Sequence, residues 1–98
     1  MPKINVSIPH GLDPQAALAR LQPALEKLAR DFQGQDLQLT TTDTTVSFSF
    51  KSLGFAIKGQ AEARPGEVAV DVELPFAAMM FKDKAQQAIE KRVSAALQ

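Results

Sequence analysis

The sequence predicts an α+β domain in which one antiparallel sheet is covered on one face by two helices. Two stretches repeat apolar residues every three or four positions, as amphipathic helices do, and five stretches alternate apolar with polar residues, as half-buried strands do. Their order along the chain is β-α-β-β-β-β-α. The chain has 98 residues, the usual size of one domain, so we expect residues 1–98 to share a single core.

The opening strand and the first helix are predicted from residues 3–32. Ile4, Val6 and Ile8 alternate with polar residues, which indicates a strand with one buried face. Asp13 is a suitable helix N-cap, and Pro14 fits the first helical position, where no backbone N–H is needed. The apolar stripe that follows at helical spacing is Leu18, Leu21, Leu25, Leu28 and Phe32.

Two further residues affect this helix. Pro23 lies within it and removes one backbone hydrogen bond, so we expect a kink. A full break is not expected, because the apolar stripe continues beyond Pro23. Gly34 is expected to end the helix in a left-handed conformation.

Four more strands are predicted between residues 37 and 74. The inward residues of the successive strands are Leu37, Leu39 and Thr41; Val46, Phe48 and Phe50; Phe55, Ile57, Gly59, Ala61 and Ala63; and Val68, Val70, Val72 and Leu74. Ser47, Ser49 and Lys58 are expected on the outer face. Turns are expected at residues 42–44, 52–54 and 64–67, the last as a type II turn with Pro and Gly at its corners.

The four strands between residues 37 and 74 form an antiparallel meander with one apolar face, and only the two helices can cover that face. If the first strand pairs with the last, the spatial order is 1-5-4-3-2, antiparallel throughout. The C-terminal helix would then lie across a curved sheet, in a reduced helix-grip arrangement. Gly59, Ala61 and Ala63 are small residues on the inner face, and they fit either a close approach of a helix or a ligand cavity beneath it.

The second helix is predicted to begin at Pro75 and to run to the C-terminus. Its core face is expected to consist of Phe81, Ala85, Ala88, Ile89, Val93, Ala96 and Leu97.

The start of this helix is unusual, because residues 74–81 are eight consecutive apolar residues. A helix that covers a sheet with one stripe cannot bury all of them. We expect Phe76, Met80 and Phe81 to face the core.

Ala78 and Met79 are then expected to form an apolar contact patch, rimmed by Lys82 and Lys84. The alternative is that the helix start wraps tightly against the first helix and leaves no patch.

Composition excludes several function classes. Eleven Lys and Arg balance eleven Asp and Glu, and the chain has no Tyr or Trp for base stacking, so no nucleic-acid partner is expected. The absence of Cys excludes disulfides, thiolate metal sites and cysteine nucleophiles. The longest apolar run is far shorter than the roughly 20 residues of a spanning helix, and no secretory signal is recognisable. We therefore expect a cytoplasmic protein with no transmembrane segment.

Few residues are candidates for catalysis. His10 is the only imidazole, and its place between strand and helix favours a loop side chain hydrogen-bonded near the helix start. Asp71 and Glu73 could stand as a carboxylate pair, but an exposed sheet face lacks the pocket that separates two pKa values. We expect no catalytic residue, no metal site, no cofactor and no enzymatic activity.

The chain resembles the polyhydroxyalkanoic acid system family, small bacterial proteins associated with polyhydroxyalkanoate granules. The resemblance covers nearly the whole chain. It rests on residues 1–4 as the opening strand and on residues 10–12 before an Ala-rich helix with Ala17 and Arg20. It also rests on residues 72–76 before the last helix and on Ile89, Glu90, Val93 and Leu97 within it.

The resemblance implies a non-enzymatic accessory protein that binds a granule surface, or a partner protein on it, through the apolar patch. A rival interpretation is a small hydrophobic-ligand carrier or a lyase-like enzyme with a cavity under the C-terminal helix. A third is that the patch forms a homodimer. A cavity lined by Phe48, Gly59, Ala61 and Met79 would favour the rival, and a filled core with Met79 exposed would favour the first interpretation.

Overall fold

The computed structural model describes residues 3–98. The elements are β1 Lys3–Pro9, α1 Pro14–Asp31, β2 Gln35–Thr42, β3 Thr45–Ser52, β4 Phe55–Arg64, β5 Glu67–Glu73, the 3-10 helix η1 Phe76–Phe81 and α2 Lys82–Leu97. The five strands form one sheet in the order β1-β5-β4-β3-β2, with every neighbouring pair antiparallel. This is the α+β architecture that the sequence predicts, and the strand order is the one expected if the first strand pairs with the last.

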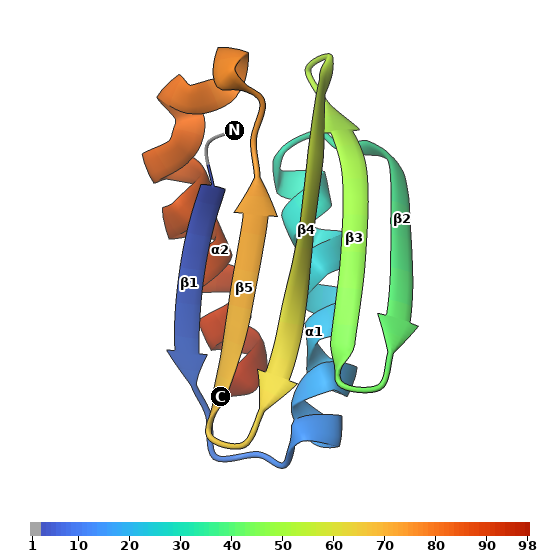
Figure 1. Cartoon of the computed structure of the whole chain (residues 1–98), viewed down its shortest axis with the longest axis vertical. Coiled ribbons are helices and arrows are strands. Elements are labelled where there is room, and N and C mark those ends of the chain that lie inside the picture. The colour runs from blue at the N-terminus through green and yellow to red at the C-terminus, as the bar shows by residue number, and fades with distance from the viewer. Residues whose placement is uncertain (1–2) are drawn as a thin grey trace.

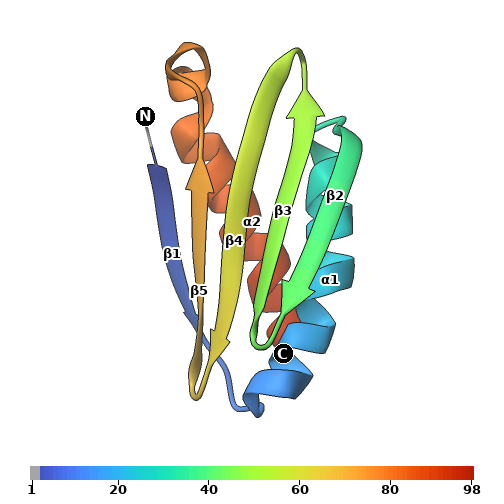
Figure 2. The same cartoon turned by 45° about the vertical axis from the view of Figure 1, so that its right-hand side comes forward.

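Both helices lie on one side of the sheet and leave its other face uncovered (Figure 1). Figure 2 shows the same two layers after rotation. The helix α1 packs against β3 and β4, and α2 packs against β1. The apolar side chains of α1, α2 and the inner sheet face form the core.

The register of the meander follows the predicted alternation. Phe48 and Phe50 are buried and Ile57 is half-buried, whereas Ser47 and Lys58 are exposed. A slip of one residue would have exchanged the two faces, so the apolar alternation has determined the pairing.

Gly59 makes room for a neighbouring side chain, which is neither the close approach of a helix nor the ligand cavity that its small size suggested. It lies opposite Phe48 in the β3–β4 ladder, and a Cβ at this position would stand 2.5 Å from Phe48 Cζ and 2.6 Å from the Asp71 carbonyl oxygen. The space above Gly59 is therefore occupied by the Phe48 ring, and neither a helix backbone nor a cavity lies there.

The first helix begins as predicted. The Asp13 side chain accepts a hydrogen bond of 2.8 Å from the Ala16 N–H, and Pro14 occupies the first turn. The helix is assigned without interruption from Pro14 to Asp31, so Pro23 does not break it.

The end of α1 differs from the prediction. The left-handed residue is Gln33, with φ of 55°, and not Gly34. Gly34 is needed for space, since a Cβ would lie 2.7 Å from Phe50 Cδ2 and 2.8 Å from the Ala29 carbonyl oxygen. The Gly34 N–H donates to that carbonyl at 2.7 Å, which closes the helix end against the sheet.

In the edge strand β2, Thr41 lies on the inner face, as predicted, but it is not buried. Thr41 is paired with the buried Val46 and shares its face, but its side chain is exposed at the sheet edge. There its Oγ1 accepts a hydrogen bond of 2.7 Å from Gln22 Nε2 on α1.

The second helix starts later than the sequence predicts. Residues Phe76–Phe81 form the 3-10 helix η1, and α2 begins only at Lys82. Ala85, Ile89, Val93 and Leu97 of α2 are buried, as predicted from their spacing.

Candidate functional site

Large apolar side chains are exposed at one end of the molecule. Among residues 3–98 they are Leu53, Phe76, Met79, Met80 and Phe81, which we call the apolar end. Leu53 lies in the β3–β4 turn and the other four lie in η1, and these two segments stand at the same end of the sheet (Figure 1). Exposed apolar residues that gather in this way are typical of a binding surface.

The 3-10 geometry explains which residues of η1 are exposed. Such a helix has three residues per turn, so residues three apart share a face. Ala78 and Phe81 share the face toward the protein, where Ala78 is only 3% exposed and Phe81, at the end of η1, is 45% exposed. Phe76 and Met79 share a second face, and Met80 lies on the third. Phe76 and Met80 are 68% and 82% exposed.

The sequence prediction for this run is therefore wrong in detail. It assumed α-helical spacing, which placed Phe76 and Met80 on one buried face. It also placed Ala78 in the exposed contact patch, whereas Ala78 is buried in the wall of a cavity. Met79 is exposed, as expected, and the contact role of the patch stays a prediction.

The β3–β4 turn adds an unusual residue to this end. Leu53 and Gly54 have φ of 52° and 85°, the pattern of a tight hairpin turn in which both central residues are left-handed. Asn, Asp or Gly is favoured at the first position, and Leu is strained there. The β2–β3 turn at the opposite end of the sheet uses the polar residue Asp43, with φ of 50°. A strained Leu that is 72% exposed points to a role outside the fold.

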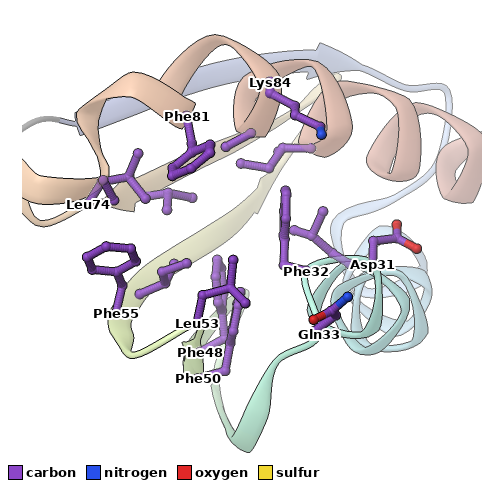
Figure 3. Close-up of a pocket in the computed structure, with 16 residues that line it drawn as sticks. Asp31, Phe32, Gln33, Phe48, Phe50, Leu53, Phe55, Leu74, Phe81 and Lys84 are labelled. Atoms are coloured by element: carbon purple, nitrogen blue, oxygen red, sulfur yellow. The ribbon is translucent and has the colours of Figure 1, made fainter.

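A cavity of about 330 Å³ lies beneath the apolar end. It is open to solvent on one side and is bordered by the end of α1, the β3–β4 hairpin, the end of β5, η1 and the start of α2. Figure 3 shows the aromatic side chains on its walls. These are Phe32, Phe48, Phe50, Phe55 and Phe81.

The aromatic residues of the chain all gather here. The sequence contains six Phe and no Tyr or Trp. Five of the six line the cavity, and the sixth, Phe76, is exposed on η1, the element that also contributes Phe81 to the lining. The fold thus brings together aromatic rings from four separate stretches of sequence.

Polar side chains on the cavity walls come from three residues, Asp31, Gln33 and Lys84. Arg92 Nε and Nη2 donate to the two carboxylate oxygens of Asp31 at 2.6 and 2.7 Å. This bidentate pair joins α1 to α2. It lowers the pKa of Asp31 through the hydrogen bonds from Arg92, and it raises the pKa of Arg92.

The two predicted lysines take different positions in the first turn of α2. Lys84 is exposed and lines the cavity, whereas Lys82 is half-buried and lies outside the lining. Among residues 3–98, none of the ion pairs involves Lys84.

The catalytic candidates lie away from the cavity. His10 Nδ1 accepts a hydrogen bond of 3.0 Å from the Leu12 N–H, and its Nε2 stands 2.9 Å from the Arg64 carbonyl oxygen. The imidazole thus braces the loop before α1, as its sequence position suggests. Asp71 is exposed and Glu73 is half-buried on the outer face of the sheet. Within the described residues, no three His, Asp or Glu side chains are grouped closely enough to hold a metal ion.

Comparison with protein families identifies the chain. The model of the family described as "Putative polyhydroxyalkanoic acid system protein" matches residues 4–97. The chain belongs to this family. A comparison with curated proteins gives no match. Within residues 3–98, no helix is both long enough and apolar enough to cross a membrane.

Two solved structures are similar to this chain in the path of the backbone. The crystal structure of Ara h 8.0201 has 11% identity and a TM-score of 0.46, with 98% of this chain and 97% of that chain covered. The crystal structure of TTHA0849 from Thermus thermophilus has 11% identity and a TM-score of 0.44, with 98% of this chain and 92% of that chain covered.

The cavity differs from the one that sequence analysis considered. Phe48 lines it, but Gly59, Ala61 and Met79 do not. Leu53 and Phe55 were missed as site residues. The signal for Leu53 was present, since a large apolar residue occupied a predicted hairpin turn where polar residues are usual.

Proposed function

We propose that this member of the family is a non-enzymatic accessory protein that binds the surface of a polyester granule through its apolar end. The observation that carries the proposal is the exposure of five large apolar side chains on two segments at the same end of the sheet, η1 and the β3–β4 turn. A solid polyester presents water with an apolar surface, and an exposed cluster of Phe, Met and Leu is complementary to it.

The energetics are adequate for reversible binding. Burying a Met or Phe side chain contributes about 1.5–3 kcal/mol, and Phe76 and Met80 are the most exposed of the large apolar side chains of η1. Lost translational freedom offsets part of this gain. Met side chains adapt to an irregular surface, which suits a polymer without a fixed lattice. Lys82 and Lys84 follow η1 directly, and their stems can lie at the rim while the ammonium groups stay in water.

The test is partitioning onto polyhydroxyalkanoate particles. Phe76→Asp and Met80→Asp each remove apolar area and add a charge, so each should weaken partitioning at least about tenfold. Gln15→Asp is the matched control, because Gln15 is exposed in the first turn of α1 at the opposite end of the molecule. It adds the same charge and should leave partitioning unchanged.

Two outcomes contradict the proposal. The first is that the wild-type protein does not bind the particles and remains in solution. The second is that both substituted proteins partition onto the particles as the wild type does. Thermal unfolding of all three variants should stay within a few degrees of the wild type, since each changed side chain is exposed. A self-association that both η1 variants abolish, without any particle binding, would favour the homodimer instead.

The cavity favours a second candidate function, the binding of a single small apolar ligand. Its volume and its aromatic lining are those of a ligand pocket. Leu53 and Phe81 belong both to the apolar end and to the cavity lining. The two candidates can still be tested separately, because Phe76 and Met80 of the apolar end do not line the cavity.

A further inference from the structure

The cavity has an apolar interior and a charged side. Its polar lining groups are Asp31 and Gln33 from the end of α1 and Lys84 from the start of α2. Figure 3 shows Lys84 extending from α2 on the side where Phe32 and Asp31 lie, away from the ring of Phe55. A ligand in this space therefore meets aromatic walls along most of its length and charged groups at one end.

The charges at that end do not cancel. Asp31 is paired with Arg92 through two hydrogen bonds, so its negative charge is already compensated. Lys84 has no ion-pair partner within residues 3–98. The uncompensated charge at the cavity is thus one ammonium group, which favours an anionic head group.

The size of the cavity sets the length of the apolar part. A volume of about 330 Å³ is near the lower limit of ligand pockets, which span about 300–1,000 Å³. At about 30 Å³ for each water-sized group, it holds a chain of about ten such groups. Leu53, Phe81 and Lys84 line the cavity and are also exposed, so they mark its opening to solvent.

We propose that the cavity binds one aliphatic carboxylate of about eight to ten carbons, with its chain between the Phe rings and its carboxylate beside Lys84. The proposal rests on the second candidate function, small-ligand binding, and it names the class of ligand. It does not depend on granule binding.

The experiment compares three probes by NMR titration of the uniformly ¹⁵N-labelled protein. Decanoate, below its micelle concentration, should shift the amides of Leu53, Ala78 and Ala85 with one-site saturation. Decyltrimethylammonium has the same chain and the opposite charge, and should bind at least about fivefold more weakly. Acetate has the head group without the chain, and should give no saturable shift.

Two lysine variants test the head-group contact. Lys84→Gln should weaken decanoate binding about threefold or more and should remove most of the preference over decyltrimethylammonium. Lys82→Gln is the matched control, because it removes the same charge two residues away, outside the cavity lining. It should leave decanoate binding unchanged. Lys84 is exposed, so its variant is expected to fold.

A cavity-filling variant separates this proposal from granule binding. Ala78→Met puts a long side chain into the cavity wall and should abolish decanoate binding while particle partitioning persists. Phe76→Asp should show the reverse. The proposal is overturned if decanoate does not bind, if both head groups bind equally, or if Lys84→Gln binds decanoate as the wild type does. Shifts confined to Phe76 and Met80 would place the chain on the apolar end and would also overturn it.

Discussion

The ring of Phe48 lies directly over Gly59, its partner across the β3–β4 ladder, with no room for a Cβ between them. This contact lets a large ring fill the centre of a sheet face that small residues would otherwise leave open. It also fixes the direction of Phe48, which continues from this contact into the cavity wall.

Gly59→Ala should therefore destabilise the protein by about 1–3 kcal/mol, the range for overpacking a core. The added methyl group meets both Phe48 and the Asp71 backbone, and the backbone cannot move aside easily. Chemical denaturation measures the loss. Gly66→Ala is the control, since no heavy atom lies within 4 Å of a Cβ at that position. Any loss of stability in this variant comes only from placing Ala at a positive φ.

Phe48→Ala should cost about 3–5 kcal/mol, because it removes a buried ring and leaves a void. A loss below about 1 kcal/mol, the range of surface changes, would mean that Phe48 is not part of the core. Denaturant unfolding of the purified variant decides between the two.

Leu53→Asn should stabilise the fold and weaken granule binding. Asn tolerates the left-handed conformation that Leu53 adopts at φ of 52°, so the substitution should gain about 1 kcal/mol. It also removes an exposed apolar side chain from the apolar end. Opposite changes in the melting temperature and in particle partitioning are expected. A variant that is less stable than the wild type would contradict the strain at this turn.

The Asp31–Arg92 pair should contribute a small, pH-dependent stabilisation. Arg92 lowers the pKa of Asp31 in the folded state. The contribution is therefore fully present above the unfolded value of about 3.9 and is lost as pH falls through the lower folded value. Both side chains are partly exposed, so we expect Asp31→Asn to lower the melting temperature by a few degrees at most.

Melting curves of the wild type and of Asp31→Asn between about pH 7 and about pH 2 test this pair. The difference between them should shrink toward the acid end. A difference that stays constant over the whole range would show that the carboxylate charge is not its source.

Sequence reasoning was most successful where residues repeat with a period. Alternating residues in β3, β4 and β5 have only two registers to choose between, and burial of Phe48 and Phe50 selects one. The same alternation, with the helix stripes, was enough to predict which side of the sheet is covered. The strand order needed one further assumption, that β1 pairs with β5, because alternation does not select the partner of a strand.

The prediction of which residues between 74 and 81 are buried was wrong for a physical reason. A run in which every residue is apolar has no period, so the pattern cannot distinguish three residues per turn from 3.6. The cavity could not be predicted from periodicity either. Its walls come from separate segments, and the distances between those segments depend on packing in three dimensions. Phe55 and Phe81 are 26 positions apart in the sequence numbering, and yet they line the same space.

The central claim is that the apolar end holds this protein on polyester granules. The most direct measurement is fluorescence localisation in polymer-accumulating cells of the tagged wild type and of a Phe76→Asp/Met80→Asp double variant. Gln15→Asp serves as the control, and all three proteins are compared at equal abundance. We predict that the wild type and Gln15→Asp outline the granules and that the double variant is spread through the cell. A wild-type protein that stays diffuse, or a double variant that still outlines the granules, would contradict the account.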